Sequence, residues 1–181
     1  MTKSTMGPAS TGDATDALVL ALARTAAAGD DDAALDQYFA ALRDRVFGGD
    51  GQLGAHLGLE VMEVSRDRVV MRMAWRRELR RWGDILHGGA IMALADHVGG
   101  CLLYVDPRVL ASGSTGLTTD FNMSFLRAAA PGDAVVATGA VLRRGRNMTF
   151  IVVEVNAESS RQLIATCRAS YLTVAGARVG K

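Results

Sequence analysis

Hydrophobic and polar residues recur along this chain with two different periods. Between residues 15 and 47 the apolar positions return every three to four residues, which is typical of amphipathic helices. This predicts one helix over Thr15–Ala28 and a second over Ala33–Phe47, separated by a glycine and a run of aspartates that suits a helix start. From Leu57 onward the period becomes two, which is the spacing of a half-buried β-strand.

One further helix interrupts the strands. It is predicted over Gly88–Tyr104 and ends at a Val-Asp-Pro turn. Strands are predicted at 59–64, 69–75, 117–126, 134–143, 148–156 and 162–174. Strict alternation in the third strand places Thr118 on the face opposite Phe121. Two strands, one long helix and then four strands favour an α+β fold in which a curved antiparallel sheet wraps around one central helix.

The same patterns divide the chain into four parts. They are a disordered lead-in (1–13), a helical N-terminal extension (14–50), a main domain (54–175) and a C-terminal tail (176–181). We expect the extension to pad the main domain or to support an oligomer. An open sheet leaves an edge strand to cover, and pairing such edges between copies would give at least a dimer.

Composition excludes several classes of function. A net charge of +1 argues against nucleic acid as the main partner. No apolar run approaches the ~20 residues of a membrane span, and no hydrophobic signal core is present, so a cytoplasmic location is expected. Cys101 and Cys167 are expected to be buried thiols, because they form no disulfide framework. The three histidines lack ligand spacing, so neither a metal nor another cofactor is expected.

Candidate chemistry concentrates in residues 86–96, where a His87-Gly88-Gly89 turn opens the central helix and Asp96 sits among apolar residues. An ionised carboxylate is costly among apolar neighbours unless it is paired or used. Open N–H groups at a helix start can hold an oxyanion. A carboxylate that acts on water and a donor that holds an oxyanion are the minimum parts for acyl hydrolysis. The alternative for Asp96 is a structural buried acid, satisfied by backbone N–H groups or by an arginine.

Several motifs follow this turn in a fixed order. They are Leu86-His87-Gly88-Gly89, Leu94-Ala95-Asp96, Thr118-x-Asp120-Phe121-x-x-Ser124-Phe125-Leu126-Arg127, Gly132-Asp133 and Arg144-Gly145-Arg146. Together they resemble the hotdog-fold acyl-CoA thioesterases of the phenylacetate-pathway and 4-hydroxybenzoyl-CoA type, over about residues 54–174. The resemblance implies that Asp96 is the general base or the nucleophile and that the Gly88 N–H stabilises the oxyanion. It also implies that His87 shapes the turn or bonds the reacting groups, and that the Thr118 hydroxyl holds the attacking water.

One position departs from the family pattern. Six residues before the histidine such thioesterases often carry Asn or Gln, whereas this chain has Arg81. Three explanations are open: the orienting role has moved, for example to Asn122, the loop is shifted, or the chemistry is weaker. The residues expected to bind substrate are Gly89, Arg81, Asn122, Arg127, Arg143, Arg144, Arg146 and Asn147. Guanidinium forks match the phosphates of coenzyme A, and a solvated basic turn is the alternative for each arginine.

Helix geometry adds an expectation about assembly. Gly88 and Asp96 are eight residues apart, which is about 12 Å at the rise of an α-helix. Donor and base must both lie within about 3 Å of one reacting carbon or its water. We therefore expect a homodimer, or a dimer of such dimers, in which each site takes Gly88 from one copy and Asp96 from the other. A non-catalytic acyl-CoA-binding regulator and a hotdog enoyl-thioester hydratase are the alternatives to an acyl-CoA thioesterase.

Overall fold

The computed structural model describes residues 11–29, 31–47 and 53–175, with side chains from Ala17 onward. Most of the predicted disordered lead-in and all of the predicted C-terminal tail lie outside these residues. The first helix begins at Thr11, inside the stretch expected to be disordered.

The N-terminal extension folds as the helices that its periodicity predicts, with one change. Helix α1 spans Thr11–Ala28 and helix α2 spans Asp32–Ala41, and the Asp31 carboxylate caps α2 by accepting from the Ala33 N–H. The second predicted helix does not stay α-helical to its end, because its last six residues, Leu42–Phe47, form a wider π-helical segment, η1. A short helix, α3 (Leu53–Leu57), leads into the sheet.

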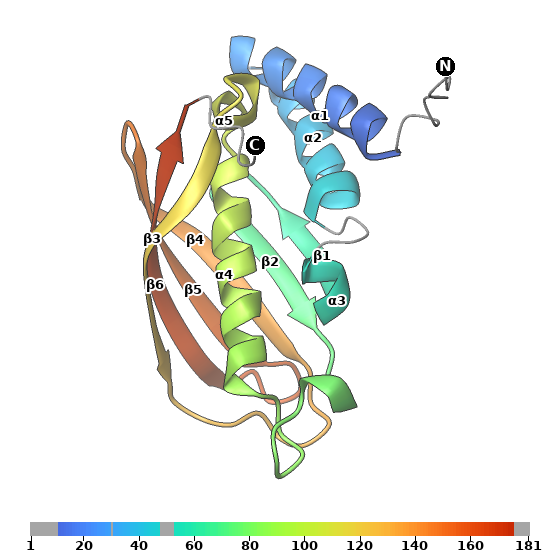
Figure 1. The fold of residues 1–181 in the computed structure, drawn as a ribbon, viewed down its shortest axis with the longest axis vertical. Helices are drawn as coiled ribbons and strands as arrows, with labels where there is room; N and C mark the ends of the chain where they lie inside the picture. The colour runs from blue at the N-terminus through green and yellow to red at the C-terminus, as the bar shows by residue number, and fades with distance from the viewer. Residues whose placement is uncertain (1–10, 30, 48–52, 176–181) are drawn as a thin grey trace, which may run out of the picture.

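Six antiparallel strands form one curved sheet (Figure 1). They are β1 (Leu59–Val64), β2 (Arg68–Met73), β3 (Thr115–Phe125), β4 (Val135–Arg144), β5 (Met148–Ala157) and β6 (Leu163–Val174). Their order across the sheet is β1-β2-β4-β5-β6-β3, so β3 pairs with β6 and lies at one edge. The predicted strands are all present, and the segment between β2 and the central helix carries a 3-10 turn, η2 (Arg77–Leu79), and an isolated antiparallel bridge between Arg80 and Leu86.

The central helix α4 (Gly88–Tyr104) lies across one face of the sheet, followed by the short helix α5 (Pro107–Ala111) (Figure 1). Leu94, Val98 and Leu102 are fully buried against the sheet. Gly139 on β4 permits this close approach, because a Cβ there would lie 2.5 Å from Val98 and 2.8 Å from Leu102. The predicted α+β architecture, a sheet wrapped around one helix, is confirmed.

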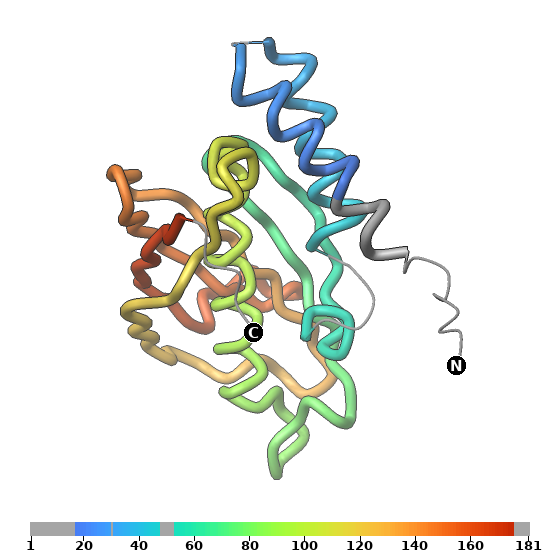
Figure 2. The backbone as a smooth tube through the Cα atoms, turned by 45° about the horizontal axis from the view of Figure 1, so that its top comes forward, coloured from blue at the N-terminus to red at the C-terminus, as the bar shows by residue number. Residues whose placement is uncertain are grey.

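The extension packs beside the C-terminal half of α4 and shares its hydrophobic core (Figures 1 and 2). Tyr38 of α2 is fully buried, and its hydroxyl donates to the carbonyl oxygen of Tyr104 at the end of α4. The extension therefore packs against the main domain, and its expected role in an oligomer stays a prediction. Among the residues placed by the structure, no helix is both long enough and apolar enough to cross a bilayer.

Candidate active site

The first turn of α4 satisfies all but one of its backbone donors. His87 is the N-cap residue, and its Nδ1 accepts from the Gly89 N–H at 2.9 Å. Its carbonyl oxygen accepts from the N–H groups of Ala90 and Ile91 at 3.0 and 3.2 Å. Within the described part of the chain, the Gly88 N–H donates to no acceptor. One donor therefore stays open at the positive end of the helix dipole, where an oxyanion is best stabilised.

The loop before α4 holds this turn in place. The His87 N–H donates to the Leu79 carbonyl at 2.8 Å, and the Arg81 N–H donates to the Ile85 carbonyl at 2.9 Å. The Arg81 side chain is exposed and donates to the carbonyl of its neighbour Trp82 at 3.2 Å. Arg81 thus shapes the loop through its backbone, and its guanidinium contacts neither Gly88 nor Asp96 within the residues described.

Asp96 lies about two turns further along α4 and is held by two hydroxyl groups from the sheet. Tyr171 donates to Asp96 Oδ1 at 3.0 Å, and Thr118 donates to the same oxygen at 3.4 Å. No donor to Asp96 Oδ2 is present in the part of the chain that the structure covers. One carboxylate oxygen is therefore positioned, while the other is free to act as a base or a nucleophile.

The single chain does not show Asp96 as a buried acid satisfied by backbone N–H groups or by an arginine. The side chain is exposed, and among the described residues no arginine and no backbone N–H donates to its carboxylate. Its hydrogen-bond donors are two hydroxyl groups, which leave its charge uncompensated. Because the Asp96 carboxylate is exposed in the single chain, it is not desolvated there. The free-energy cost of its desolvation arises only when another surface covers Asp96.

A β-bulge in β3 turns Thr118 toward Asp96. The pairing of β3 with β6 shifts by one residue between Thr118 and Asp120, so Thr119 is the extra residue. The Thr119 hydroxyl lies 3.0 Å from the Ser170 carbonyl, to which it donates. Thr118 and Phe121 consequently line the same hollow beside Asp96, whereas strict alternation predicted opposite faces. That prediction was wrong because a bulge re-aims the side chains that precede it relative to those that follow.

Tyr171 is the site residue that sequence reasoning missed. It lies opposite Thr118 on the neighbouring strand, and only 3% of its side chain is exposed. Gly99 on α4 leaves room for it, since a Cβ there would lie 2.4 Å from the Tyr171 hydroxyl. Burial and the nearby Asp96 carboxylate raise the pKa of Tyr171 far above its usual range, so it remains a neutral donor. Its only sequence signal is a polar-tipped aromatic residue in a strand of otherwise mostly small or aliphatic residues.

The two cysteines are buried free thiols, as predicted. Burial raises the pKa of Cys167 to about 11, with a further contribution from the carboxylates of Asp96 and Asp120. Burial also raises the pKa of Cys101. Both thiols are therefore protonated near neutral pH and are weak nucleophiles.

Two predicted binding residues lie at the sheet edge, one on the exposed strand β3 and one in the loop after it. Asn122 on β3 is exposed and shares its face with Asp120, away from the face on which Phe121 lies beside Asp96. Arg127 is also exposed, and its guanidinium donates to the Leu163 carbonyl at 3.1 Å. Neither side chain contacts Asp96 within the described residues of its own chain.

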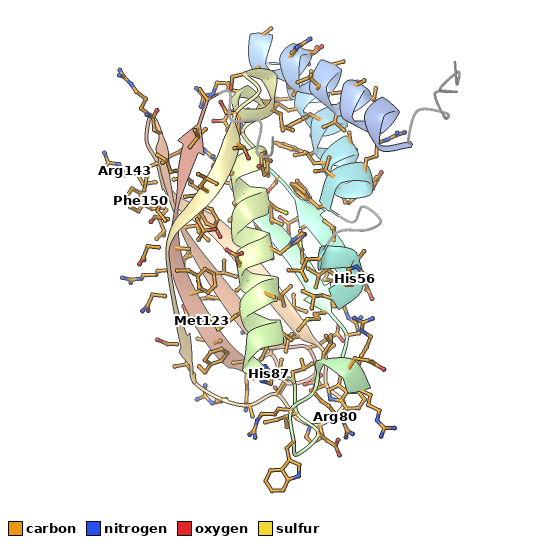
Figure 3. The ribbon with its side chains drawn as sticks, in the orientation of Figure 1. His56, Arg80, His87, Met123, Arg143 and Phe150 are labelled. Atoms are coloured by element: carbon orange, nitrogen blue, oxygen red, sulfur yellow. The ribbon has the colours of Figure 1, made fainter. Side chains whose placement is uncertain are left out.

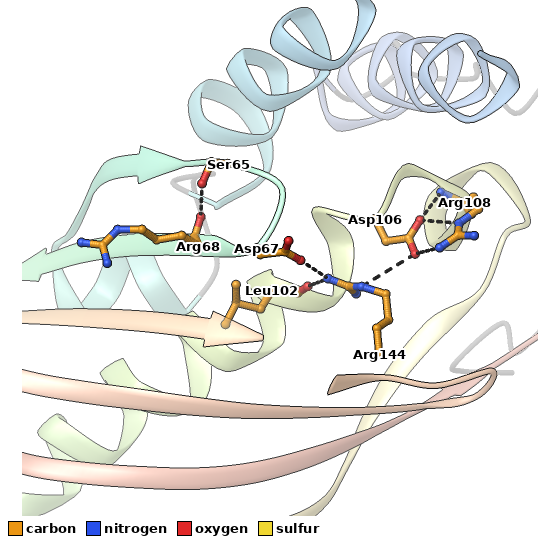
Figure 4. Close-up of polar contacts among 7 residues, drawn as sticks. All are labelled: Ser65, Asp67, Arg68, Leu102, Asp106, Arg108 and Arg144. Carbon is orange, nitrogen blue, oxygen red and sulfur yellow. Dashed lines mark hydrogen bonds and ion pairs between the residues drawn. The ribbon is translucent and has the colours of Figure 1, made fainter. Parts of the chain in front are cut away.

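Four predicted binding residues lie on the β4–β5 hairpin. One side chain is bonded within the chain, and the other three are exposed. Arg144 donates to the Leu102 carbonyl at 3.3 Å and lies 3.9 Å from the carboxylates of both Asp67 and Asp106 (Figure 4). Its guanidinium is thus engaged within the chain. Arg143, Arg146 and Asn147 are exposed, and Figure 3 shows Arg143 far along the sheet from His87.

The two parts of the predicted site remain apart within one chain. Gly88 and Asp96 share one continuous helix, so their separation along its axis is about 12 Å. Figure 3 shows His87 at the end of α4, where the open donor lies. A single chain therefore offers an oxyanion donor and a carboxylate that cannot reach the same reacting carbon.

Known proteins are similar to this chain in sequence. Residues 83–164 match the Thioesterase superfamily. A protein of Thermoplasma acidophilum that carries the name esterase is 30% identical over 109 residues, which cover 60% of this chain and 78% of that protein. Acyl-coenzyme A thioesterase 13 of Homo sapiens is 26% identical over 110 residues, which cover 61% of this chain and 76% of that enzyme.

Solved structures share the fold. Thioesterase superfamily member 2 of zebra fish superposes with a TM-score of 0.64 at 24% identity, over 73% of this chain and 95% of that one. The PaaI protein from the phenylacetic acid degradation operon of E. coli superposes with a TM-score of 0.61 at 20% identity, over 68% and 84%. The hotdog fold expected from the sequence is confirmed. The chain belongs to the thioesterase superfamily, and thioester hydrolysis is the chemistry of its class.

Proposed function

We propose that this protein hydrolyses acyl-CoA thioesters in active sites that two copies of the chain share. The observation that carries the proposal is the presence of two groups in the chain. One is the open Gly88 N–H, and the other is the Asp96 carboxylate, of which one oxygen accepts hydrogen bonds from two hydroxyl groups. A donor for the oxyanion and a positioned base or nucleophile are what thioester hydrolysis requires. The similarity to acyl-coenzyme A thioesterase 13 supports coenzyme A as the thiol part of the substrate.

The reaction can follow two routes from this geometry. In the first, Asp96 takes a proton from a water held by Thr118, and the hydroxide oxygen bonds to the thioester carbon. In the second, Asp96 Oδ2 attacks that carbon to give an anhydride, which water then hydrolyses. In both routes the Gly88 N–H stabilises the oxyanion, the C–S bond breaks, and the thiolate of coenzyme A leaves and takes up a proton.

The exposed edge of the sheet supports a shared site. One edge of β3 pairs with β6, and the other has no partner among the described strands, although β3 is eleven residues long. Leu117, Phe125 and Met92 are 47%, 48% and 41% exposed around it. A long edge strand flanked by exposed apolar side chains is a template for pairing with another copy. A two-fold axis beside β3 would bring each Gly88 toward the partner's Asp96.

The anionic end of coenzyme A needs cationic partners on the surface. Arg127, Arg143, Arg146 and Asn147 are exposed and could supply them, whereas the guanidinium of Arg144 is already engaged. His87 orders the turn that carries Gly88 and Gly89, and Arg81 and Asn122 stay proposed partners of the substrate. Assembly of two such dimers would bring further hairpins within reach of one substrate.

Mixed dimers test the shared site directly. The Asp96→Asn variant is expected to lose at least a hundredfold in kcat, because removal of a general base costs about 10²–10⁴. A second variant, Gly88→Pro, lacks the open N–H and is expected to be similarly impaired. Unfolding and refolding the two inactive chains together gives mixed dimers that contain one intact site.

The measured quantity is thiol release from acyl-CoA substrates, followed with 5,5′-dithiobis(2-nitrobenzoate). Recovery of close to a quarter of the wild-type activity per chain is expected for equal mixing. Absence of recovery in mixed dimers confirmed by mass spectrometry would contradict the shared site. If the wild-type protein binds acyl-CoA tightly without turnover on any acyl group, it is a binding protein rather than an enzyme.

A further inference from the structure

A pocket of about 240 Å³ lies beside Asp96 on the side of the N-terminal extension. Asp96, Gly100 and Tyr104 line it at intervals of four residues, so the pocket follows one face of α4 away from the carboxylate. Val46 and Phe47, the last two residues of η1, form the wall that faces this helix. Among the described residues, neither lysine nor arginine lines the pocket, which therefore suits an apolar group rather than the phosphates of coenzyme A.

A hydrogen bond fixes the wall to the helix that carries the carboxylate. His97, the residue after Asp96, has its Nε2 at 3.2 Å from the Phe47 carbonyl oxygen. The Phe47 side chain is 2% exposed. The hydrogen bond and this burial together hold the wall at a fixed place relative to Asp96.

Gly100 keeps the middle of the pocket open. A Cβ at this position would meet no atom within 4 Å, whereas a Cβ at the neighbouring Gly99 would collide with Tyr171. Packing within the chain therefore explains why position 99 is a glycine, but it does not explain the glycine at position 100. A glycine in a helix interior costs about 0.5–1 kcal/mol relative to alanine, so a larger residue would stabilise α4 if the space had no use.

Asp96 lies between this pocket and a second hollow on the exposed face. Thr118 lines both hollows, and the second one also includes Met92, Ala93 and Phe121. A thioester carbon placed over Asp96 can therefore send its acyl group to one side and its sulfur to the other. The exposed side leads to the surface, where the large and anionic coenzyme A can be solvated.

We infer that the pocket binds the acyl group and that the end of the N-terminal extension, Val46 and Phe47, limits the size of that group. This inference rests on the proposed function. A cavity of about 150 Å³ accommodates benzene, so about 240 Å³ accommodates a phenyl-sized group with one or two more carbons, or a linear chain of about eight carbons. Short and medium acyl groups or aryl groups of that size fit, and long fatty chains do not.

Two variants change the pocket in opposite directions. Gly100→Leu fills it from the helix side, where the structure has open space, and Phe47→Ala lengthens it at the wall. Gly100→Ala is the matched control, because it adds a single methyl group and retains most of the volume. Thermal unfolding checks that each variant is folded, and the Gly100 variants test the inference even if Phe47→Ala loosens the extension.

The first measurement is kcat/KM for acyl-CoA substrates from acetyl to palmitoyl. The ratio of octanoyl to acetyl is expected to fall at least tenfold in Gly100→Leu, and the longest accepted chain is expected to increase in Phe47→Ala. Turnover with unchanged ratios in both variants would overturn the inference and leave the proposed function intact.

The second measurement does not depend on turnover. Calorimetry gives the Kd of octanoyl-CoA and of free coenzyme A for Asp96→Asn, with and without Gly100→Leu. The octanoyl group is expected to strengthen binding at least tenfold, and Gly100→Leu is expected to abolish that gain. Equal affinity for the two ligands in Asp96→Asn would overturn the inference. Absence of hydrolysis together with a gain that depends on Gly100 would instead overturn the proposed function and retain the pocket.

Discussion

The two ends of α4 differ in how the hydrogen bonds of their backbone groups are satisfied. At its C-terminal end all four final carbonyls accept hydrogen bonds: those of Cys101 and Leu103 from backbone N–H groups after the helix, that of Leu102 from Arg144, and that of Tyr104 from Tyr38. At its N-terminal end three of the first four N–H groups are satisfied and that of Gly88 is open. Among the described residues the Gly88 N–H is thus the one donor of this helix start without a partner, as the proposed oxyanion site requires.

Removing the open donor is expected to have the largest effect. Gly88→Pro deletes the N–H at the first helical position, where proline is well tolerated. His87 already has φ −69° and ψ 135°, which suits a residue before proline. We expect kcat to fall by about 10²–10³, the usual cost of losing one oxyanion donor, with little change in the melting temperature.

Gly88→Ala is the control for this variant. It keeps the N–H, and its Cβ would lie 3.4 Å from the half-exposed ring of Phe125. Turnover by Gly88→Pro at the level of Gly88→Ala would show that the open N–H is not used in the reaction.

Loss of the Tyr171 hydroxyl is expected to have a smaller effect on the reaction. Tyr171→Phe keeps the buried ring and removes the donor to Asp96 Oδ1. We expect kcat to fall about tenfold with little change in KM, since hydrogen bonds to charged groups contribute about 1.5–3 kcal/mol. A lower melting temperature with an unchanged kcat would indicate a structural role only.

At the C-terminal end of α4 the same type of change should affect stability rather than turnover. Tyr38→Phe leaves the Tyr104 carbonyl without its donor inside the core. The free energy of unfolding is expected to fall by about 1–2 kcal/mol, which corresponds to roughly 3–6 °C in a chain of this size. Urea titration and kcat/KM at a temperature below the transition measure the two effects. A tenfold loss of kcat/KM in the folded variant would contradict the division between the two ends.

The smallest effect is expected at Asp106, just beyond this end. Burial alone would raise the pKa of Asp106, but hydrogen bonds from Arg108 and the charges of Arg108 and Arg144 lower it on balance. A lowered pKa in the folded state means that the ionised carboxylate stabilises the fold above the pKa of the unfolded chain. That contribution is lost as the pH falls through the folded-state value.

Asp106→Asn keeps the capping group of α5 and removes only the charge. It is expected to lower the free energy of unfolding by about 0.5–1 kcal/mol at pH 7, because one partner, Arg108, is largely exposed. The difference from wild type should shrink as the pH falls below about 4. A difference that stays constant from pH 7 to pH 3 would contradict the assignment to the charge.

The comparison also separates what the sequence predicts from what it does not. The Gly88 end of α4 depends on His87 and on residues within one helical turn, so local rules for helix starts were sufficient to identify it. The Asp96 carboxylate depends on Thr118 and Tyr171, which are 22 and 75 residues away along the chain. Their approach requires the β3–β6 register and the Thr119 bulge, which no period of apolar residues encodes.

The pocket wall and Arg144 illustrate the same limit. Val46 falls on the apolar face of the second predicted helix and Phe47 is its last residue, and nothing in that periodicity places them across from Asp96. Arg144 belongs to a basic turn, and only the fold shows that its guanidinium points inward to Leu102. Both outcomes depend on contacts between distant segments, whereas the fold itself followed from the order and period of the elements.

The bulge at Thr119 has a consequence for comparing relatives. In a β3 strand of the same length without the bulge, Thr119 would pair in the ladder, and a threonine at position 118 would lie on the face opposite Phe121. Two chains could then carry threonine in the same alignment column, and only the one with the bulge would present it to the carboxylate. Transfer of a residue's role between members of this superfamily therefore requires the strand register as well as the residue's identity.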